Sequence, residues 1–278
     1  MSFYPQPDSY RCGPFALKYA LVMLGIFKHE DQIAYISGST WWAGTDEIGL
    51  QKAAKKFNVR MKYLQSSNPN DARKMLNVEL AKGRPCLLCV RNWEHWCTVV
   101  HHGRGLYVVV DSEQDKVIVI KNSEQLLRYW RYKDRDTGVI SYDAYAIIPN
   151  FKTYTRAQFT PATAKQLMSK KYNSLSLKWD QYFNDLISIT RPRTKLTINA
   201  ISFSEFLRRN KENLVTQVAN WHGMPSYNEL TNILDNMNFI AEIYDLIVPT
   251  DEEKHALIDV TSILMMYACG KYGMDPIY

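Results

Sequence analysis

The sequence predicts an α+β fold for residues 1–149, followed by an all-helical region over residues 162–278. Up to residue 82, apolar side chains recur at helical spacing, and from residue 85 the pattern changes to short β-rich runs separated by glycine or charged turns. After Pro149 these runs stop and helical patterns return. Helices that precede a group of antiparallel strands are typical of α+β domains.

The first helix is predicted over residues 14–24, where apolar side chains occur nearly all round the helix, as in a central, buried helix. Pro14 suits the first helical position and Gly25 suits the end. Two amphipathic helices follow at residues 46–57 and 70–82. The first of these has acidic residues at its start and basic residues at its end, as the helix dipole favours.

Five short runs rich in β-branched and aromatic residues predict an antiparallel sheet. They lie at residues 85–90, 95–100, 105–112, 115–121 and 144–149. The segment HHGRG, over residues 101–105, supplies a turn. The runs on either side of it are therefore expected to be adjacent strands.

The second half of the chain shows mainly helical patterns. Residues 150–161 are predicted to be a connector, and residues 162–278 a helical domain interrupted near residues 191–195, 222–226 and 248–254. No internal repeat or low-complexity segment occurs in the sequence. This helical domain is expected to cover a cleft in the first domain or to bind a protein partner.

Composition limits the class of protein. The 278 residues are 46% hydrophobic, enough to bury the core of one large or two modest domains. The N-terminus lacks the pattern of a signal peptide, and no stretch approaches the ~18 apolar residues of a membrane-spanning helix. Five cysteines, an odd number spread through predicted strands and helices, are typical of a reducing compartment. We therefore expect a globular, cytoplasmic protein.

The charge is mild for this length, at +6. Basic residues form local clusters at residues 128–136 and 191–195, but most are scattered along the chain. Scattered charge is more typical of solvated faces than of a nucleic-acid interface. Nucleic-acid binding is therefore the weakest of the functional hypotheses.

Cys12 ends a polar turn in the stretch QPDSYRCGPF, directly before the first helix. Unpaired N–H groups and the helix dipole stabilise a thiolate there, and the thiolate is the nucleophilic form. The other cysteines lie in apolar runs and are predicted to be structural; they are Cys86, Cys89, Cys97 and Cys269. The C-x-x-C spacing at residues 86–89 has no second Cys or His pair at ligand spacing, so no metal or other cofactor is predicted.

A nucleophilic cysteine needs a base, and a group that orients the base. His95 begins the run HWCTVV, and Asp111 ends the run on the predicted neighbouring strand. The two side chains can therefore lie side by side across the sheet, as an imidazole held by a carboxylate. His101 and His102 are predicted to lie in an exposed hairpin turn, and either becomes a substitute base if the strand register is shifted.

Five short features follow one another in a set order. They are Gln6 six residues before Cys12, Cys-Gly opening the first helix, LAKGRP before a strand, HWCTVV around His95, and VVVDS around Asp111. In this order and spacing, residues 1–149 resemble the papain-like cysteine peptidases, and among them the bacteriocin-processing type, family C39.

The resemblance implies a papain-like domain in which the central helix packs on the antiparallel sheet. It also implies that Cys12 is the nucleophile, His95 the base and Asp111 the acid that orients the base. Gln6 would then donate to the oxyanion, together with the backbone N–H of Cys12. The chain departs from the family pattern at Arg11, where the family often has Asp. It departs again at Ser112, where the family often has Pro.

These features predict a cysteine peptidase that cleaves a peptide or isopeptide bond through a Cys12 thioester. A deamidase or amide-acyl transferase would use the same groups, because only the attack by water or by an amine differs. A non-catalytic, peptidase-like interaction module is the alternative from another class. Trp93 and Trp96, beside His95, are predicted to line the substrate cleft. The expected partners are a peptide or protein substrate and a protein bound by the helical domain.

Overall fold

The computed structural model describes residues 2–169, 175–194, 199–220 and 225–271. The chain divides into two compact units, Met1–Leu177 and Lys178–Tyr278. Residues 151–160, all described, contain no helix or strand. The predicted connector lies before the division between the units, and its role as a domain boundary stays a prediction.

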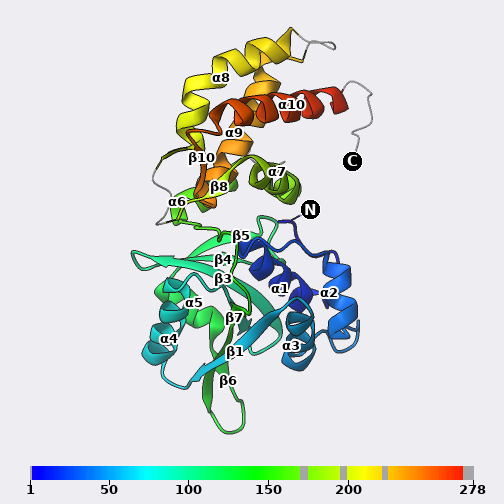
Figure 1. Ribbon diagram of the computed structural model, residues 1–278. Coiled ribbons are helices and arrows are strands. Elements are labelled where there is room, and N and C mark those ends of the chain that lie inside the picture. The colour runs from blue at the N-terminus through cyan, green and yellow to red at the C-terminus, as the bar shows by residue number, and fades with distance from the viewer. Residues whose placement is uncertain (1, 170–174, 195–198, 221–224, 272–278) are drawn as a thin grey trace. The chain divides into compact units, whose positions relative to one another are not determined.

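The first unit is built round an antiparallel sheet of seven strands (Figure 1). The strands are β1 (Val59–Ser66), β2 (Cys86–Val90), β3 (His95–Gly103), β4 (Leu106–Val110), β5 (Ile118–Asn122), β6 (Tyr132–Lys133) and β7 (Ile140–Pro149). Their order is β1-β7-β2-β3-β4-β5, and β6 pairs with β7. The five predicted runs are strands, whereas β1 and β6 were not predicted from the sequence.

Helices cover both faces of this sheet (Figure 1). They are α1 (Cys12–Met23), α2 (Glu30–Ser37), α3 (Glu47–Lys56), α4 (Pro69–Ala81) and α5 (Ser123–Trp130). A sixth helix, α6 (Pro161–Leu167), lies near β4 and β5. Alternate residues of β2 face opposite sides: Leu87 packs with α1 to α3, whereas Cys86 and Leu88 pack with α4 and α5. The mixed helix and sheet architecture predicted for residues 1–149 is confirmed.

The central helix α1 is buried along its whole length. The sequence predicted Pro14 as the first residue of this helix. The helix begins at Cys12 instead, so Pro14 is its third residue. The first turn of a helix tolerates proline at these positions because its N–H groups have no intrahelical acceptor. Gly25 follows the end of the helix with a φ of 73°, a conformation that glycine adopts without strain.

Polar contacts fix α1 against its surroundings. Thr98 on β3 donates to the carbonyl of Ala16 over 2.7 Å. At Gly13 the helix passes so close to the loop before α3 that an added Cβ would lie 3.0 Å from the Cβ of Thr45. The start of α1 is therefore held against β3 and this loop.

The second unit is not all-helical, so that prediction is corrected. Its helices are α7 (Leu175–Ile189), which begins in the first unit, α8 (Phe203–Ala219), α9 (Tyr227–Ile243) and α10 (Glu253–Lys271). Three short strands form an antiparallel sheet in the order β8-β10-β9: β8 (Arg191–Pro192), β9 (Ala200–Ser202) and β10 (Leu246–Pro249). Runs of two to four residues are too short for periodicity to separate strand from helix.

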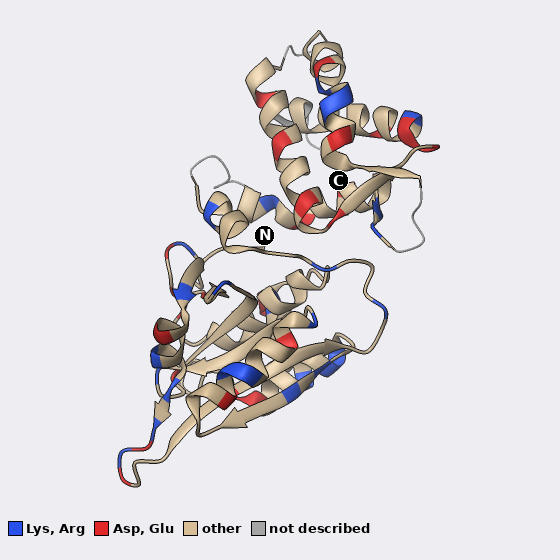
Figure 2. Ribbon diagram, turned by 90° about the vertical axis from the view of Figure 1, so that its left-hand side faces the viewer, with Lys and Arg blue, Asp and Glu red and all other residues tan. Residues whose placement is uncertain are grey.

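Charges of both signs are interspersed on each unit (Figure 2). Several residues of the two basic clusters are paired with acids: Arg128 with Glu124, Arg191 with Glu252, and Arg193 with Asp245. Within the described ranges, no helix combines the length and the apolar character needed to cross a lipid bilayer.

Candidate active site

His95 is the first residue of β3 and its side chain is fully buried. It follows a turn in which Arg91, Asn92 and Trp93 have positive φ angles, of 53°, 57° and 69°. This conformation costs a residue with a Cβ atom about 1–2 kcal/mol, so it persists only where the surroundings impose it. One such restraint is the Arg91 N–H, which donates to the carbonyl of Tyr129 on α5 over 3.1 Å. The turn holds the start of β3 in one position.

A β-bulge between β3 and β4 sets the face on which Asp111 lies. The register of the two strands shifts by one residue between Val99 and His101. Continuing the shifted register beyond the end of β4 places Asp111 on the same face as His95 and diagonal to it. A one-residue shift moves every side chain to the other face, so an unbroken register would turn the Asp111 carboxylate away from His95.

The Asp111 carboxylate is buried and fully engaged. Its Oδ1 lies 2.7 Å from Nε2 of His95 and accepts the backbone N–H of Glu113 over 3.1 Å. Its Oδ2 accepts the Tyr129 hydroxyl over 2.7 Å. Burial raises the pKa of Asp111, but the hydrogen bonds and the charge of His95 outweigh this and lower it. The carboxylate is therefore ionised and fixed beside the ring.

The other ring nitrogen of His95, Nδ1, has no hydrogen-bond partner of standard geometry among the described residues. Burial lowers the pKa of His95, whereas the interactions of the ring with Asp111 and with Cys12 raise it, to about 9. Such interactions act at close range, so the Cys12 thiol lies near the ring. Because Asp111 occupies Nε2, Nδ1 is the nitrogen left for the thiol. These interactions therefore favour the protonated ring.

A second carboxylate lies beside the ring. Oε1 of Glu113 is 3.4 Å from Nδ1 of His95. The guanidinium of Arg91 binds both oxygens of Glu113, one of them over 3.2 Å. This ion pair offsets the negative charge of Glu113 near the ring.

Cys12, the first residue of α1, is 7% exposed. The preceding residue, Arg11, provides no side-chain cap, and in the described part of the chain the N–H groups of Cys12 and Gly13 have no acceptor. Burial raises the pKa of the thiols of Cys86, Cys89 and Cys97, which disfavours their thiolates. The side chain of Cys269 lies outside the described residues.

Gln6 is anchored to the residue after Asp111. Its backbone N–H donates to the carbonyl of Ser112 over 2.9 Å, and the Ser112 hydroxyl donates to Oε1 of Gln6 over 2.5 Å. Gln6 is half-buried and makes no hydrogen bond to Cys12 in the described structure. Gln6 was predicted from its spacing to Cys12 along the sequence, and its observed contacts place it beside the segment that holds His95.

The two tryptophans predicted to line the cleft differ in position. Trp96 is buried in the same hydrophobic cluster as Cys12, and its indole N–H donates to the carbonyl of Thr45 over 3.0 Å. Trp93 is half exposed, stacks on Tyr132 with ring centroids 3.8 Å apart, and donates to Asp143 over 3.0 Å. Trp96 is thus part of the core beneath Cys12, whereas Trp93 belongs to the surface turn before His95.

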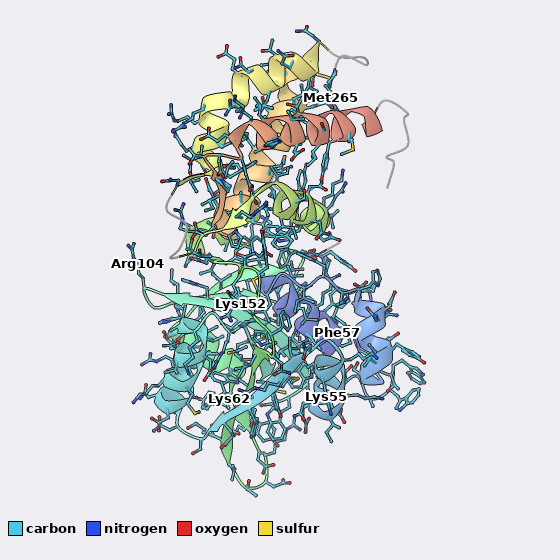
Figure 3. All side chains as sticks on the ribbon, viewed as in Figure 1. Lys55, Phe57, Lys62, Arg104, Lys152 and Met265 are labelled. Atoms are coloured by element: carbon cyan, nitrogen blue, oxygen red, sulfur yellow. The ribbon has the colours of Figure 1, made fainter. Side chains whose placement is uncertain are left out.

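His101 and His102 lie within β3 and are half-buried, so the prediction that they belong to an exposed turn is wrong. The turn consists of Arg104 and Gly105, with φ angles of 51° and 74°, as in a two-residue hairpin turn. Arg104 projects from its tip (Figure 3). Burial lowers the pKa of both histidines.

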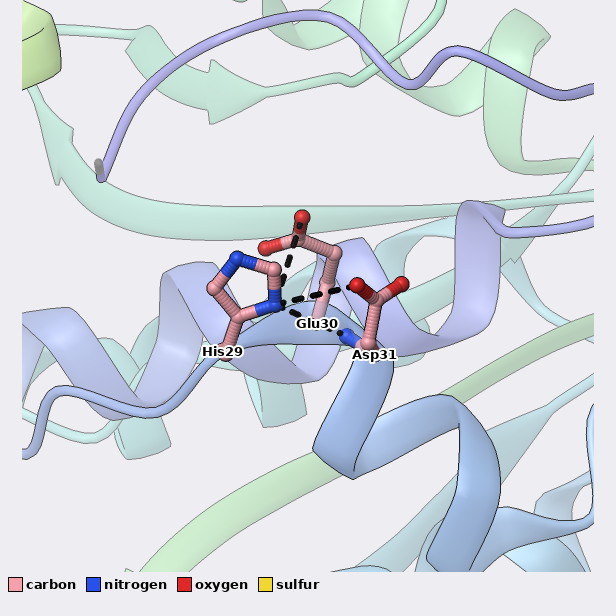
Figure 4. A group of neighbouring side chains, drawn as sticks. All are labelled: His29, Glu30 and Asp31. Atoms are coloured by element: carbon pink, nitrogen blue, oxygen red, sulfur yellow. Dashed lines mark hydrogen bonds and ion pairs between the residues drawn. The ribbon is translucent and has the colours of Figure 1, made fainter.

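One group of side chains in the described residues has the composition of a metal site: His29, Glu30 and Asp31, at the start of α2 (Figure 4). Their ligand atoms lie within 4.8 Å of one another. However, Glu30 forms a buried ion pair with Lys18 over 2.7 Å, and Asp31 pairs with Arg11. The carboxylates thus join α2 to α1 and its preceding residue, and their charges are matched by Lys18 and Arg11.

Sequence reasoning missed three residues of this site: Tyr129, Ser112 and Glu113. Helical spacing from Leu126 places Tyr129 on the sheet side of α5, but nothing in the sequence links its hydroxyl to Asp111. Ser112 and Glu113 follow Asp111 directly, so their proximity could have been predicted, though not their partners.

Comparisons with known proteins give partial likenesses of fold. No protein-family model matches the chain, and no curated protein matches its sequence. The peptidase domain of Streptococcus ComA, a bi-functional ABC transporter involved in a quorum sensing pathway, is similar with 18% identity and a TM-score of 0.41, over 53% of this chain and 98% of that one. A double glycine motif protease from an AMS/PCAT transporter, in complex with the leader peptide, has 17% identity and a TM-score of 0.38, over 51% and 89%. The peptidase domain of Streptococcus mutans ComA has 17% identity and a TM-score of 0.31, over 51% and 98%.

Proposed function

We propose that the chain is a cysteine peptidase that forms a thioester at Cys12. One observation supports this above all: Asp111 holds the buried His95 ring at Nε2, and interactions of the ring with Asp111 and Cys12 raise its pKa. A burial this complete costs an ionisable ring free energy unless its charge is matched. The Asp111 carboxylate and the Cys12 thiolate provide that match.

In the proposed first step, the thiolate of Cys12 attacks the carbonyl carbon of a peptide or isopeptide bond. The Sγ–C bond forms, and the carbonyl oxygen takes the negative charge. The N–H of Cys12 and the amide of Gln6 donate to this oxygen. The C–N bond then breaks, and the leaving amine takes the proton from Nδ1 of His95.

In the second step, neutral His95 takes a proton from water, whose oxygen attacks the thioester carbon. The C–S bond breaks, the carboxylic acid is released, and Cys12 and His95 return to the ion pair. An amine in place of water would give a transferase, and a side-chain amide as substrate would give a deamidase. Asp111 keeps the ring in one orientation throughout.

The rate of Cys12 alkylation by iodoacetamide tests the proposal. We expect rapid alkylation of Cys12 at pH 6 in the wild type, located by peptide mapping, while Cys86, Cys89 and Cys97 react slowly. His95→Ala should remove the rapid phase, because it removes the cation that stabilises the thiolate. His102→Ala, on the same strand, is the matched control and should retain it.

A peptide library digested by the wild type but not by Cys12→Ala would then identify the bond cleaved. A Cys12 that alkylates only above pH 8 and is indifferent to His95 would contradict the proposal. It would leave the non-catalytic interaction module as the better hypothesis.

A further inference from the structure

We propose that Ser112 is a positioning residue that orients the side-chain amide of Gln6 towards the oxyanion formed at Cys12. The inference rests on the proposed function, since it concerns the same site. Ser112 stands where the resemblance would place a proline, and a proline has no side-chain donor.

Two hydrogen bonds join Gln6 to Ser112, one between the main chains and one between the side chains. The Gln6 N–H donates to the Ser112 carbonyl, which fixes the main chain of the N-terminal segment. The Ser112 hydroxyl donates to Oε1 of Gln6 over 2.5 Å, which fixes the side chain. Ser112 itself is 1% exposed, so water does not compete freely for its hydroxyl.

In the structure the Ser112 hydroxyl engages the oxygen end of the Gln6 amide. The terminal torsion of glutamine is broad and roughly two-fold, so an unrestrained amide presents its oxygen about as readily as its nitrogen. An amide oxygen facing an oxyanion is repelled, whereas an N–H stabilises it. With Oε1 engaged by Ser112, the NH2 group is the end left to donate.

The position of Ser112 in the chain links this donor to the base. Asp111, its neighbour, holds His95 at 2.7 Å. The segment is fixed in turn by the Asp111 N–H, which donates to the carbonyl of Val117 over 2.6 Å, and by Gln114, which donates to the Asp111 carbonyl over 3.2 Å. One short turn therefore orients the base and the oxyanion donor together.

Two reagents separate this role from a merely structural one. With p-nitrophenyl acetate, the Sγ of Cys12 bonds to the acetyl carbon, the carbonyl oxygen becomes an oxyanion, and p-nitrophenolate leaves with the electron pair of the broken C–O bond. With iodoacetamide, Sγ bonds to the methylene carbon as iodide leaves, and no oxyanion forms. Only the first reaction depends on Gln6 and on its orientation.

The experiment measures both rates at Cys12 in the wild type, Ser112→Ala, Gln6→Ala and the double variant. Ser112→Ala should slow acetylation about fivefold, the effect of losing one neutral hydrogen bond, and leave alkylation unchanged. Gln6→Ala should slow acetylation by about 10²–10³. The double variant should be no slower than Gln6→Ala, because Ser112 acts through Gln6. Ser141→Ala, which removes a buried serine hydroxyl that accepts from Gln65, is the matched control and should change neither rate.

Three results would overturn the inference: acetylation unchanged in Ser112→Ala, losses that multiply in the double variant, or alkylation slowed as much as acetylation. A wild-type Cys12 that alkylates slowly and independently of His95 would overturn the proposed function, and this inference with it. A rapid, His95-dependent alkylation with acetylation indifferent to Gln6 would keep the nucleophile and reject both Gln6 and Ser112.

Discussion

Replacing Asp111 by asparagine should lower the pKa of His95. In the wild type the ring is fully buried, and its interactions with Asp111 and Cys12 raise its pKa from 6.5 to about 9. At pH 8 such a ring is about 90% protonated, whereas a ring with the ordinary value is about 3% protonated. Asparagine occupies the same volume without the charge at 2.7 Å, while burial still favours the neutral ring. We expect the pKa of His95 in Asp111→Asn to fall to 6.5 or below.

Ring ¹⁵N chemical shifts measured against pH report this equilibrium directly. In the wild type, one histidine should titrate near pH 9, and His95→Ala should remove that signal. His101 and His102 do not obscure it, because burial lowers their pKa. Asp143→Asn, which removes another buried carboxylate, should leave the signal in place. A wild type without a histidine titrating above pH 8, or a signal unmoved by Asp111→Asn, would refute the reasoning.

Three further predictions concern stability, measured by urea unfolding. The folded pKa of His95 lies above the unfolded value of 6.5, so its contribution to the free energy of unfolding is complete below pH 6.5. That contribution is lost as the pH rises through about 9. The loss should be about 3 kcal/mol in the wild type and absent in His95→Ala. Gly13→Ala should destabilise the fold by about 1–3 kcal/mol, because its Cβ would crowd that of Thr45, and an unchanged midpoint would contradict this packing. Burial raises the pKa of Glu79, but hydrogen bonds from Lys62, Lys82 and Arg84 lower it, from 4.5 to about 2. Its contribution is present above pH 4.5 and is lost as the pH falls through about 2, so Glu79→Gln should show a weaker loss of stability over that range.

The sequence predicted the elements whose ends carry their own signals. The helices predicted over residues 46–57 and 70–82 are α3 and α4, and Asp46 and Asn68 accept backbone N–H groups at their starts. The adjacency of β3 and β4 followed from their spacing and the glycine in the turn. β1 pairs with β7 along its whole length, with Val59 opposite Pro149. It was not predicted, because polar residues on this edge strand mask the alternation of apolar and polar side chains.

The site needed information that no local pattern holds. The bulge between Val99 and His101 decides the face of Asp111, yet the run of β-branched residues there would suit an unbroken strand equally well. The hydroxyl of Tyr129 reaches Asp111 from α5, a contact that depends on how the helix packs. Such tertiary contacts follow from the fold as a whole, and sequence spacing alone could not predict them.

The start of α1 differs from the helices around it in a way that fits the proposed chemistry. All residues between 12 and 130 are described, and four of the five helices in this range begin after a side chain that accepts a backbone N–H; these caps are His29, Asp46, Asn68 and Asn122. α1 begins instead after Arg11, which has no acceptor and pairs with Asp8 and Asp31. A missing cap costs a helix about 1 kcal/mol. A capping oxygen at this position would accept the N–H of Gly13, next to the Cys12 N–H that we propose as an oxyanion donor. The missing cap therefore leaves the start of α1 open to a substrate carbonyl.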